Sequence, residues 1–564
     1  MIFIRALHNQ KTFYIVFVFV LMFTNTVLLF TEGFGFFAKI AVFCIPLSIQ
    51  MLLLALSKRP GKVFLFLLPK CIIDAFQLVL IKLFGGSIIA VDMFLNLATT
   101  STTEAGELLS NLLPTIAFLL ILYIPSILLA VRSIKQAENI DRRFRKKCFL
   151  LSGVIFLIGA ASLTGAKFSK SGFTIKYDLY PCNVVYNLDF AIKKYYKILN
   201  CDRTTRDFTF EATKEDRKTA GKAGREIYVL ILGETARASN WHIYGYPRNT
   251  TPHLDTLTNL IKYRDVLTQS NTTHKIVPMV FSPADADNFD LIYRCKSLVT
   301  AFKEVGFKTV FLSNQSYNKS FTENYYNAAD IKYNIKKVTV NTYDHQLLPL
   351  FNKIIEQDTT SNMFIILHLY GSHFNYHQRY AKEFQQFVPD EAKMISQKYQ
   401  NELINSFDNS ILSTDDFITR VISKIHEQGC QSSVLYLSDH GEDMRDDKRG
   451  RFLHASPIPT YYQLHIPYLI WMSEKYKELN AEKFAQTSIH SNYPISNNTV
   501  FHTMLDLASI HTKYLDSTLS VSSPKLKRTP RKYLDDHDLG IRIDKIRFTK
   551  YDYEQFLQRG LELH

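Results

Sequence analysis

The stretch that decides the fold is EIYVLILGETARASNWHIYGYPRNTTP, residues 226–252. Its first part, residues 227–232, is an unbroken apolar run, which predicts a buried β-strand ending at Gly233. The polar residues that follow are Glu234, Thr235 and Arg237. Because ligands of open α/β sheets bind at the carboxyl ends of the strands, these residues are candidates for a functional site, and Glu234 is the first of them.

Short apolar runs alternate with helical periodicity through the rest of the chain, which predicts a mostly parallel sheet with helices on both faces, an α/β/α domain. Further strands are predicted at residues 309–312, 363–369 and 434–437, and helices at 298–305, 344–355 and 413–426. The sequence has no internal repeat, Walker loop or GxGxxG motif. The binding residues are therefore expected at the strand ends.

Four predicted strands end in side chains that could bind a ligand. They are Glu234 at the first, Asn314 at the second, His368 and His373 at the third, and Asp439, His440 and Glu442 at the fourth. One polar strand end is commonplace. Four of them at one edge of a parallel sheet predict a site.

Asp439 and His440 give the sharpest signal. Adjacent carboxylate and imidazole groups at a strand end can both turn toward one cation, and this pair of ligands suits zinc or manganese better than calcium. The alternative is a capping aspartate beside a packed histidine. Glu234 on a neighbouring strand favours the metal site.

A nucleophile is sought in VLTQSNTTHKIVPMVFS, which follows Asp265 and contains Thr272 and Thr273 near an expected helix start. A hydroxyl is a weak nucleophile, but coordination to zinc lowers its pKa and holds it beside an electrophile. The alternative is that a threonine here only caps the helix.

The first third of the chain predicts a membrane domain of five helices, residues 1–170. Five apolar stretches are each long enough to cross a bilayer, which takes about 20 helical residues. They lie near 13–30, 37–56, 63–83, 109–131 and 149–166. The first lacks a cleavage site, so we expect an uncleaved anchor. Five such stretches argue against the alternative, the buried helices of a soluble core.

The loop charges orient these spans. Arg5 and Lys11 precede the first span, three basic residues follow the second, and seven lie between the fourth and fifth, whereas no Lys or Arg occurs from residue 83 through 131. The positive-inside rule places the amino terminus in the cytoplasm, and five spans then export the chain after Ala166. Much of the net charge of +14 is explained in this way, so nucleic-acid binding is not expected.

Residues 171–222 are predicted to bridge the two domains. Apolar residues about four apart within 180–200, with lysines between them, predict an amphipathic helix on the membrane surface or packed on the exported domain. Residues 213–225 are polar and predict a linker. The exported domain, 223–564, ends in a basic segment around Lys525, Lys527, Arg528, Arg531 and Lys532, which is expected to face solvent or lipid headgroups.

Four of the seven cysteines belong to the exported part: Cys182, Cys201, Cys295 and Cys430. An oxidising compartment permits disulfides, and Cys182 with Cys201 is the favoured pair, although sequence does not fix connectivity.

Five segments, taken together, resemble the phosphoethanolamine transferases of Gram-negative inner membranes, members of the alkaline phosphatase superfamily. They are GETARASNWHIYGYPRNTTPHL, the segment around Thr273 with PMVFS after it, LHLYGSHFNYHQRY, LSDHGEDM and FLHASPIPTYYQLHIPYLIW. The family plan of five spans, a bridging segment and a periplasmic catalytic domain also matches. The resemblance implies a sulfatase-like fold for residues 223–564.

The resemblance also implies roles for single residues. Zinc, as one ion or as two or more, would be bound by Glu234, Asp439, His440 and Thr273, and Thr273 would be the nucleophile. Substrate groups would be bound by His373, His454, Glu442, His368 and Asn314. Among these, His373 and His454 would hold the phosphoryl group or a second zinc, and Asn314 is the loosest match.

Thr273 is preferred over Thr272 because the family nucleophile lies five residues before a proline, which is Pro278 here. The sequence departs from the best-known members, whose nucleophile is flanked by two cysteines. Gln269 and Met279 stand in their places, so that disulfide is absent and acceptor specificity does not transfer.

The implied function is transfer of phosphoethanolamine from phosphatidylethanolamine to lipid A, the lipopolysaccharide core or another envelope glycan, by a monomer in the inner membrane with a periplasmic catalytic domain. A covalent threonine intermediate implies ping-pong kinetics. The alternatives are a membrane-tethered phosphodiesterase or sulfatase-like hydrolase, a glycerol-phosphate transferase, and an inactive sensor or scaffold. The absence of CxPxR and SxPxR signatures argues against a sulfatase.

Overall fold

The computed structural model describes residues 9–99, 106, 109, 112–168, 173–214, 224–316, 321–337 and 342–563. By internal contacts the chain forms two compact units. The membrane unit comprises Met1–Phe94, Leu108–Ile192 and Lys448–Arg451, and the sheet unit comprises Leu95–Glu107, Lys193–Asp447 and Phe452–His564. The predicted domain boundaries at residues 170 and 222 stay predictions.

The membrane unit is helical. Its long elements are α2 (Gln10–Thr31), α3 (Phe36–Leu56), α4 (Pro60–Phe66), α5 (Leu68–Phe84), α8 (Leu113–Lys135) and α9 (Arg142–Phe168). Among the described residues, α2, α3, α8 and the stretch 142–167 of α9 are each long and apolar enough to cross a membrane, and α4 with α5 makes a fifth candidate span, bent by 58°. Proline lacks a backbone N–H and disfavours helical backbone before it, so Pro69 in the first turn of α5 explains the break.

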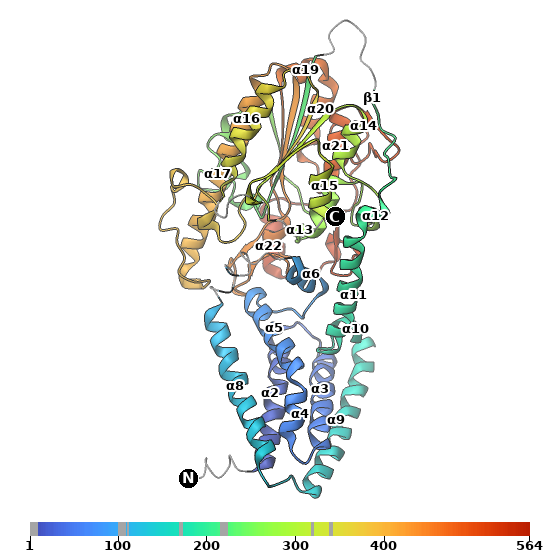
Figure 1. The fold of residues 1–564 in the computed structure, drawn as a ribbon, viewed down its shortest axis with the longest axis vertical. Coiled ribbons are helices and arrows are strands. Elements are labelled where there is room, and N and C mark those ends of the chain that lie inside the picture. The colour runs from blue at the N-terminus through green and yellow to red at the C-terminus, as the bar shows by residue number, and fades with distance from the viewer. Residues whose placement is uncertain are drawn as a thin grey trace. The chain divides into compact units, whose positions relative to one another are not determined.

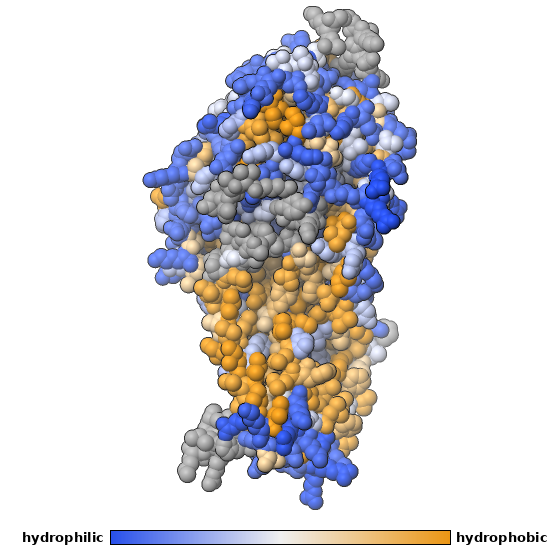
Figure 2. Space-filling model, in the orientation of Figure 1, coloured by the Kyte–Doolittle hydropathy of each residue, from blue (hydrophilic) through white to orange (hydrophobic). Residues whose placement is uncertain are grey.

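The outer surface of this unit is apolar, as lipid contact requires. Phe19, Leu120 and Leu150 are 65%, 52% and 71% exposed, and hydrophobic residues cover the visible face of these helices in Figure 2. Its interior holds an ion pair between Lys70 Nζ and Asp74 Oδ2, 2.6 Å apart. The Tyr180 hydroxyl also donates to Asp74, over 2.6 Å.

Other helices described before β2 include α6 (Val91–Thr99), α10 (Ile175–Asp178), α11 (Cys182–Leu199) and α12 (Cys201–Thr204). Helix α11 confirms the predicted helix over residues 182–199 of the stretch 180–200. Its exposed apolar side chains include Val185, Ile192 and Tyr196, in keeping with the predicted amphipathic character.

The sheet unit is built on seven strands in the order β3-β10-β7-β2-β6-β4-β5. They are β2 (Glu226–Gly233), β3 (Leu260–Tyr263), β4 (Lys308–Ser313), β5 (Ile331–Asn334), β6 (Met363–His368), β7 (Gln431–Ser438) and β10 (Tyr468–Met472). The pairs within β7-β2-β6-β4-β5 are parallel, and β10 is antiparallel to both of its neighbours. The predicted mostly parallel sheet is confirmed, whereas β3, β5 and β10 were not predicted.

Helices cover both faces of this sheet (Figure 1). Side chains of β2 alternate between two cores: Ile227, Val229 and Ile231 pack on one face with α16 (Leu348–Gln357) and α17 (Gln400–His426). Tyr228, Leu230 and Leu232 pack on the other face with α13 (Thr273–Phe281), α14 (Leu298–Glu304), α15 (Phe321–Ala328) and α21 (Thr499–Leu507). A strand buried on both faces has no polar side, which explains the unbroken apolar run.

Smaller elements complete the unit. The short helices are α18 (Tyr461–Leu464), α19 (Glu474–Leu479), α20 (Ala481–Ile489) and α22 (Lys550–Gln558). Three antiparallel pairs join β1 (Thr213–Lys214) to β11 (Ile510–His511), β8 (Asp443–Met444) to β9 (Phe452–Leu453), and β12 (Lys532–Leu534) to β13 (Gly540–Arg542). The predicted linker therefore begins with a strand, and its residues 215–223 lie outside the described residues.

Two expectations were wrong. All seven cysteines are free. The 18-residue helix α11, about 27 Å long at 1.5 Å per residue, lies between Cys182, its first residue, and Cys201, the first residue of α12. Arg531 of the basic segment is not solvated. It is 4% exposed, and its guanidinium contacts Asp265 Oδ1 at 2.5 Å, because a buried charge requires a partner.

Candidate active site

The carboxyl ends of β2, β4, β6 and β7 lie at one edge of the sheet. Leu232 of β2 and Ser313 of β4 both pair with His368, and Gly233 pairs with Ser438 of β7. The next residues along β2 and β7, Glu234 and Asp439, therefore leave neighbouring strands at the same level. Local sequence supplies the residue types, and the strand register brings them together.

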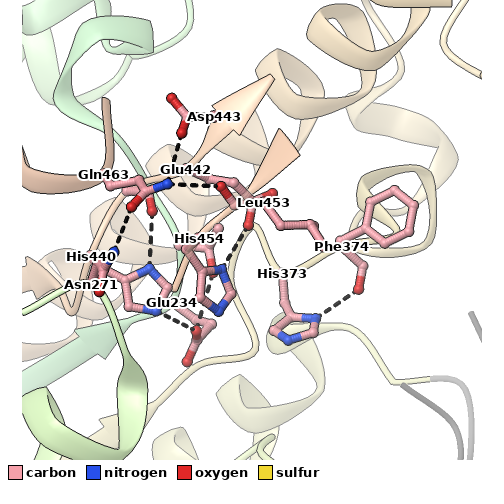
Figure 3. Close-up of polar contacts among 12 residues, drawn as sticks. Glu234, Asn271, His373, Phe374, His440, Glu442, Asp443, Leu453, His454 and Gln463 are labelled. Atoms are coloured by element: carbon pink, nitrogen blue, oxygen red, sulfur yellow. Dashed lines mark hydrogen bonds and ion pairs between the residues drawn. The ribbon is translucent and has the colours of Figure 1, made fainter. Parts of the chain in front are cut away.

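Glu234, Asp439 and His440 form a buried cluster whose ligand atoms lie within 4.8 Å of one another. His440 Nε2 is 3.6 Å from Glu234 Oε1 and 3.2 Å from Asp439 Oδ2. Figure 3 shows the His440 imidazole directed at the Glu234 carboxylate. Two carboxylates and one imidazole within this distance are a suitable ligand set for a divalent cation.

The surroundings of the cluster fit a metal ion. Asp439 Oδ2 is buried without a hydrogen-bond partner among the described residues, and burial raises the pKa of Asp439 to about 6. Burial also lowers the pKa of His440 well below its ordinary value. Its Nδ1 is 3.0 Å from the Gly441 carbonyl, which orients the ring so that Nε2 faces the carboxylates. A cation at this point would stabilise the carboxylates and use the neutral imidazole as a ligand.

Thr273 adds a hydroxyl to this cluster. It is the first residue of α13, and its Oγ1 lies 3.0 Å from Glu234 Oε1 and 3.1 Å from His440 Nε2. Thr272 is the N-cap, and its Oγ1 lies 3.3 Å from Ser270 Oγ instead. Of the two threonines weighed from the sequence, Thr273 is the one beside the candidate metal ligands.

His454, His373 and Glu442 lie beside the cluster. The His454 and His440 ring centroids are 4.1 Å apart, and those of His454 and His373 are 6.4 Å apart. His454 Nδ1 is 2.9 Å from Glu442 Oε2, and the Tyr376 hydroxyl donates to the other Glu442 oxygen. Figure 3 shows the His373 and His454 rings on the same side of the cluster.

Two predicted residues do not join this group. Both ends of the Asn314 amide are occupied, with Nδ2 donating to Asp344 over 2.7 Å and Oδ1 accepting from Thr342 over 2.5 Å. His368 faces the core beside Phe311, with ring centroids 6.2 Å apart. Burial lowers the pKa of His368 to about 3, so the ring is neutral. Their predicted substrate contacts stay predictions.

Gln315 is a site residue that sequence reasoning missed. Its Nε2 donates to Glu234 Oε2 over 3.1 Å and to the Leu369 carbonyl over 2.7 Å, so it orients the carboxylate. The polar triplet Ser313-Asn314-Gln315 marks this strand end, but only the path of the chain after β4 decides which side chain turns to the site.

Two family models match the chain. The model described as Sulfatase matches residues 226–510, half of the chain, and the model described as Phosphoethanolamine transferase EptA/EptB matches residues 42–196. The chain belongs to the phosphoethanolamine transferase family. Both predicted parts of this family plan, the helical part and the sulfatase-type domain, are thus confirmed.

Curated phosphoethanolamine transferases resemble the chain over part of its length. Kdo(2)-lipid A phosphoethanolamine 7''-transferase of Escherichia coli K12 is 31% identical over 267 residues, 46% of each chain. Phosphoethanolamine transferase EptC of the same strain is 29% identical over 319 residues, 54% of each chain. The chain spans about half the length of the curated relatives it matches.

Solved phosphoethanolamine transferases support the fold. The periplasmic domain of EptC from Escherichia coli, also solved in complex with Zn, covers 60% of this chain and 96% of its own, with 27% identity and a TM-score of 0.54. The integral membrane protein EptA of Neisseria meningitidis covers 90% of this chain and 97% of its own, with 22% identity and a TM-score of 0.69. The candidate spans and the match to an integral membrane protein support the multi-pass membrane location, and the matched EptC domain is periplasmic.

Proposed function

We propose that this protein transfers phosphoethanolamine from phosphatidylethanolamine to lipid A or the lipopolysaccharide core, with Thr273 as the nucleophile. One observation carries the proposal: the Thr273 hydroxyl lies 3.0 Å from Glu234 and 3.1 Å from His440, within the candidate metal ligands. Curated relatives named for this transfer support the donor group and the class of acceptor.

Zinc is the metal we propose, held by Glu234, Asp439, His440 and Thr273. Carboxylate and imidazole ligands suit it, and the homologous EptC domain has been solved with Zn. When bound, zinc would act as a Lewis acid that polarises a phosphoryl oxygen and lowers the pKa of a neighbouring hydroxyl. These four side chains supply enough ligands for one zinc ion.

The side chains of Thr273 and Glu234 carry out the bond-forming and proton-transfer steps. Thr273 Oγ1 attacks the phosphorus, the bond from phosphorus to the diacylglycerol oxygen breaks, and diacylglycerol leaves with a proton. Glu234 Oε1, 3.0 Å from Thr273 Oγ1, is placed to accept the hydroxyl proton. An acceptor hydroxyl then attacks the same phosphorus, the bond from phosphorus to Thr273 Oγ1 breaks, and the proton that the acceptor loses passes to Oγ1 and restores the Thr273 hydroxyl.

His373 and His454 are proposed to bind the non-bridging phosphoryl oxygens. Glu442 occupies Nδ1 of His454, which leaves Nε2 of that ring for the substrate. His368 and Asn314 are retained as more distant contacts to the donor headgroup, reached only if the surrounding loops change.

The reaction is tested with fluorescent phosphatidylethanolamine and the full-length protein in mixed micelles. We expect labelled diacylglycerol, and none from phosphatidylglycerol. Turnover of phosphatidylglycerol alone would instead indicate a glycerol-phosphate transferase, and steady release of free phosphoethanolamine in the presence of acceptor would indicate a hydrolase. A folded, metal-free and inactive protein would indicate a sensor or scaffold.

The acceptor is tested separately by mass spectrometry of lipid A from cells with and without the protein. A gain of one phosphoethanolamine group identifies lipid A as the acceptor. No change in lipid A, with labelled diacylglycerol still released in the micelle assay, directs the search to core sugars and other envelope glycans.

A further inference from the structure

The C-terminal hairpin, residues 532–542, contains β12 and β13 and lies outside the residues that either family model matches. It nevertheless contacts residues 269–275, the nucleophile segment, which leads into α13 and contains Thr273. Both stretches belong to the sheet unit. The contacts occur at three successive points along the segment.

The first point is a backbone hydrogen bond. The Leu534 N–H donates to the Gln269 carbonyl over 2.6 Å. Leu534 is fully buried. Since a buried backbone group needs a partner, this bond fixes the start of the nucleophile segment against β12.

The second point is Asn271, two residues before Thr273. The Tyr533 hydroxyl donates to Asn271 Oδ1 over 2.8 Å. On its other side, Asn271 Nδ2 donates to the Ser456 carbonyl over 2.8 Å and to Gln463 Oε1 over 2.6 Å. The buried Asn271 side chain is therefore held from both sides, and the hairpin supplies the hydrogen bond to its Oδ1.

The third point is Lys275, two residues after Thr273, whose side chain is fully buried. Its ammonium group donates to the Asp535 carbonyl over 2.7 Å and lies 3.7 Å from Asp538 Oδ1. Lys194 of α11 contacts the same Asp538 oxygen at 2.5 Å. A buried lysine at the amino-terminal end of a helix opposes the helix dipole, so these contacts are needed to hold it there.

We propose that the C-terminal hairpin is a clamp that positions Thr273, with Tyr533 and Asp538 as positioning residues. The two side-chain contacts, to Asn271 and to Lys275, lie two residues on either side of Thr273. The clamp fixes the approach of Oγ1 to the phosphorus and leaves the metal site unchanged. Its effect on turnover rests on the proposed function.

The test compares two conservative variants of the full-length protein. Tyr533→Phe removes only the hydroxyl on Asn271. Tyr263→Phe is the matched control, because Tyr263 is also buried and its hydroxyl donates to the Thr487 carbonyl over 2.8 Å, away from the nucleophile segment. Both variants lose one buried hydrogen bond and should show similar decreases in Tm.

Hydrogen–deuterium exchange provides a readout that does not depend on activity. We expect the amides of residues 269–276 to exchange about 5-fold faster in Tyr533→Phe than in the wild type, which is the change that the loss of one hydrogen bond produces. Their exchange rate in Tyr263→Phe should equal that of the wild type. Equal protection of this segment in the two variants would overturn the clamp. If the wild-type protein releases no diacylglycerol, the proposed function fails. The exchange measurement alone then shows whether the hairpin holds residues 269–276 in place.

Turnover provides the second readout. With an active wild type, Tyr533→Phe should lower kcat about ten-fold, with KM and zinc content unchanged, because misplacing a nucleophile slows the chemical step. Tyr263→Phe should retain kcat. A loss of zinc together with activity in Tyr533→Phe would mean that the hairpin supports the metal site, and would also overturn the clamp.

Discussion

Two adjacent threonines have different surroundings at the site. Thr273 Oγ1 contacts Glu234 and His440, whereas Thr272 Oγ1 contacts the Ser270 hydroxyl. The difference follows from helix geometry, because the N-cap has extended backbone and the next residue has already turned into the helix. One position along the chain thus separates a candidate nucleophile from a neighbour with a structural role.

Replacing each threonine tests this assignment. Thr273→Ala should lower kcat by about 10³-fold or more, because the variant loses the hydroxyl that lies between Glu234 and His440. Zinc content by mass spectrometry should be largely retained, since Glu234, Asp439 and His440 remain. Thr272→Ala is the control and should keep most of the activity. Wild-type turnover in Thr273→Ala would remove it from the mechanism.

The broken span α4–α5 has an ion pair in the first two turns after the break. Lys70 and Asp74 lie one turn apart in α5, and Lys70 Nζ also donates to the Leu21 carbonyl of α2 over 2.8 Å. Ionisable residues in the apolar part of a membrane are costly unless they are paired. The pair therefore joins α5 to α2 and, through Asp74, to Tyr180.

Removing one member of this pair should destabilise the membrane unit. Asp74→Ala leaves the Lys70 ammonium group buried without its carboxylate, and we expect a loss of about 3 kcal/mol in the free energy of unfolding. Thermal unfolding in detergent measures it. The double variant Lys70→Met, Asp74→Leu should recover most of the stability. Equal stability of Asp74→Ala and the wild type would show that the pair contributes nothing.

The broken span also decides the topology of the chain. If α4 and α5 cross the membrane as one span, five crossings place the residues after α9 on the opposite side from the amino terminus. A phosphatase reporter, active only outside the cytoplasm, should therefore be active when fused after Phe168 and inactive when fused after Lys135. The reversed pattern, with activity after Lys135 and none after Phe168, would indicate that α4–α5 returns to its own side.

At the scale of the whole molecule, buried histidines link stability to pH. Burial lowers the pKa of His368 to about 3 and the pKa values of His465 and His502 to about 4, so all three are neutral in the folded protein. In the unfolded chain they bind protons below about pH 6.5. The stability that these three neutral histidines contribute is therefore fully present above pH 6.5 and is lost as the pH falls toward 4.

His368 allows this linkage to be measured, because neither ring nitrogen has a hydrogen-bond partner among the described residues. Between pH 6 and 4.5, His368→Leu should make the decrease in unfolding free energy shallower by about 1.4 kcal/mol per pH unit, the contribution of one titrating group. Chemical unfolding at several pH values gives the slope. An unchanged slope would mean that His368 is protonated in the folded protein or that the unfolded reference differs.

The sequence by itself determined the spans, the strands flanking the site and the polar residues at their ends, because apolar runs and periodicity are properties of neighbouring residues. It also placed Glu234, Asp439 and His440 in one candidate metal site. Only the tertiary structure decided the antiparallel β10, the separation of Asn314 from the site, the part played by Gln315 and the hairpin beside Thr273. These depend on contacts between residues far apart in the chain, and no local pattern encodes such pairings.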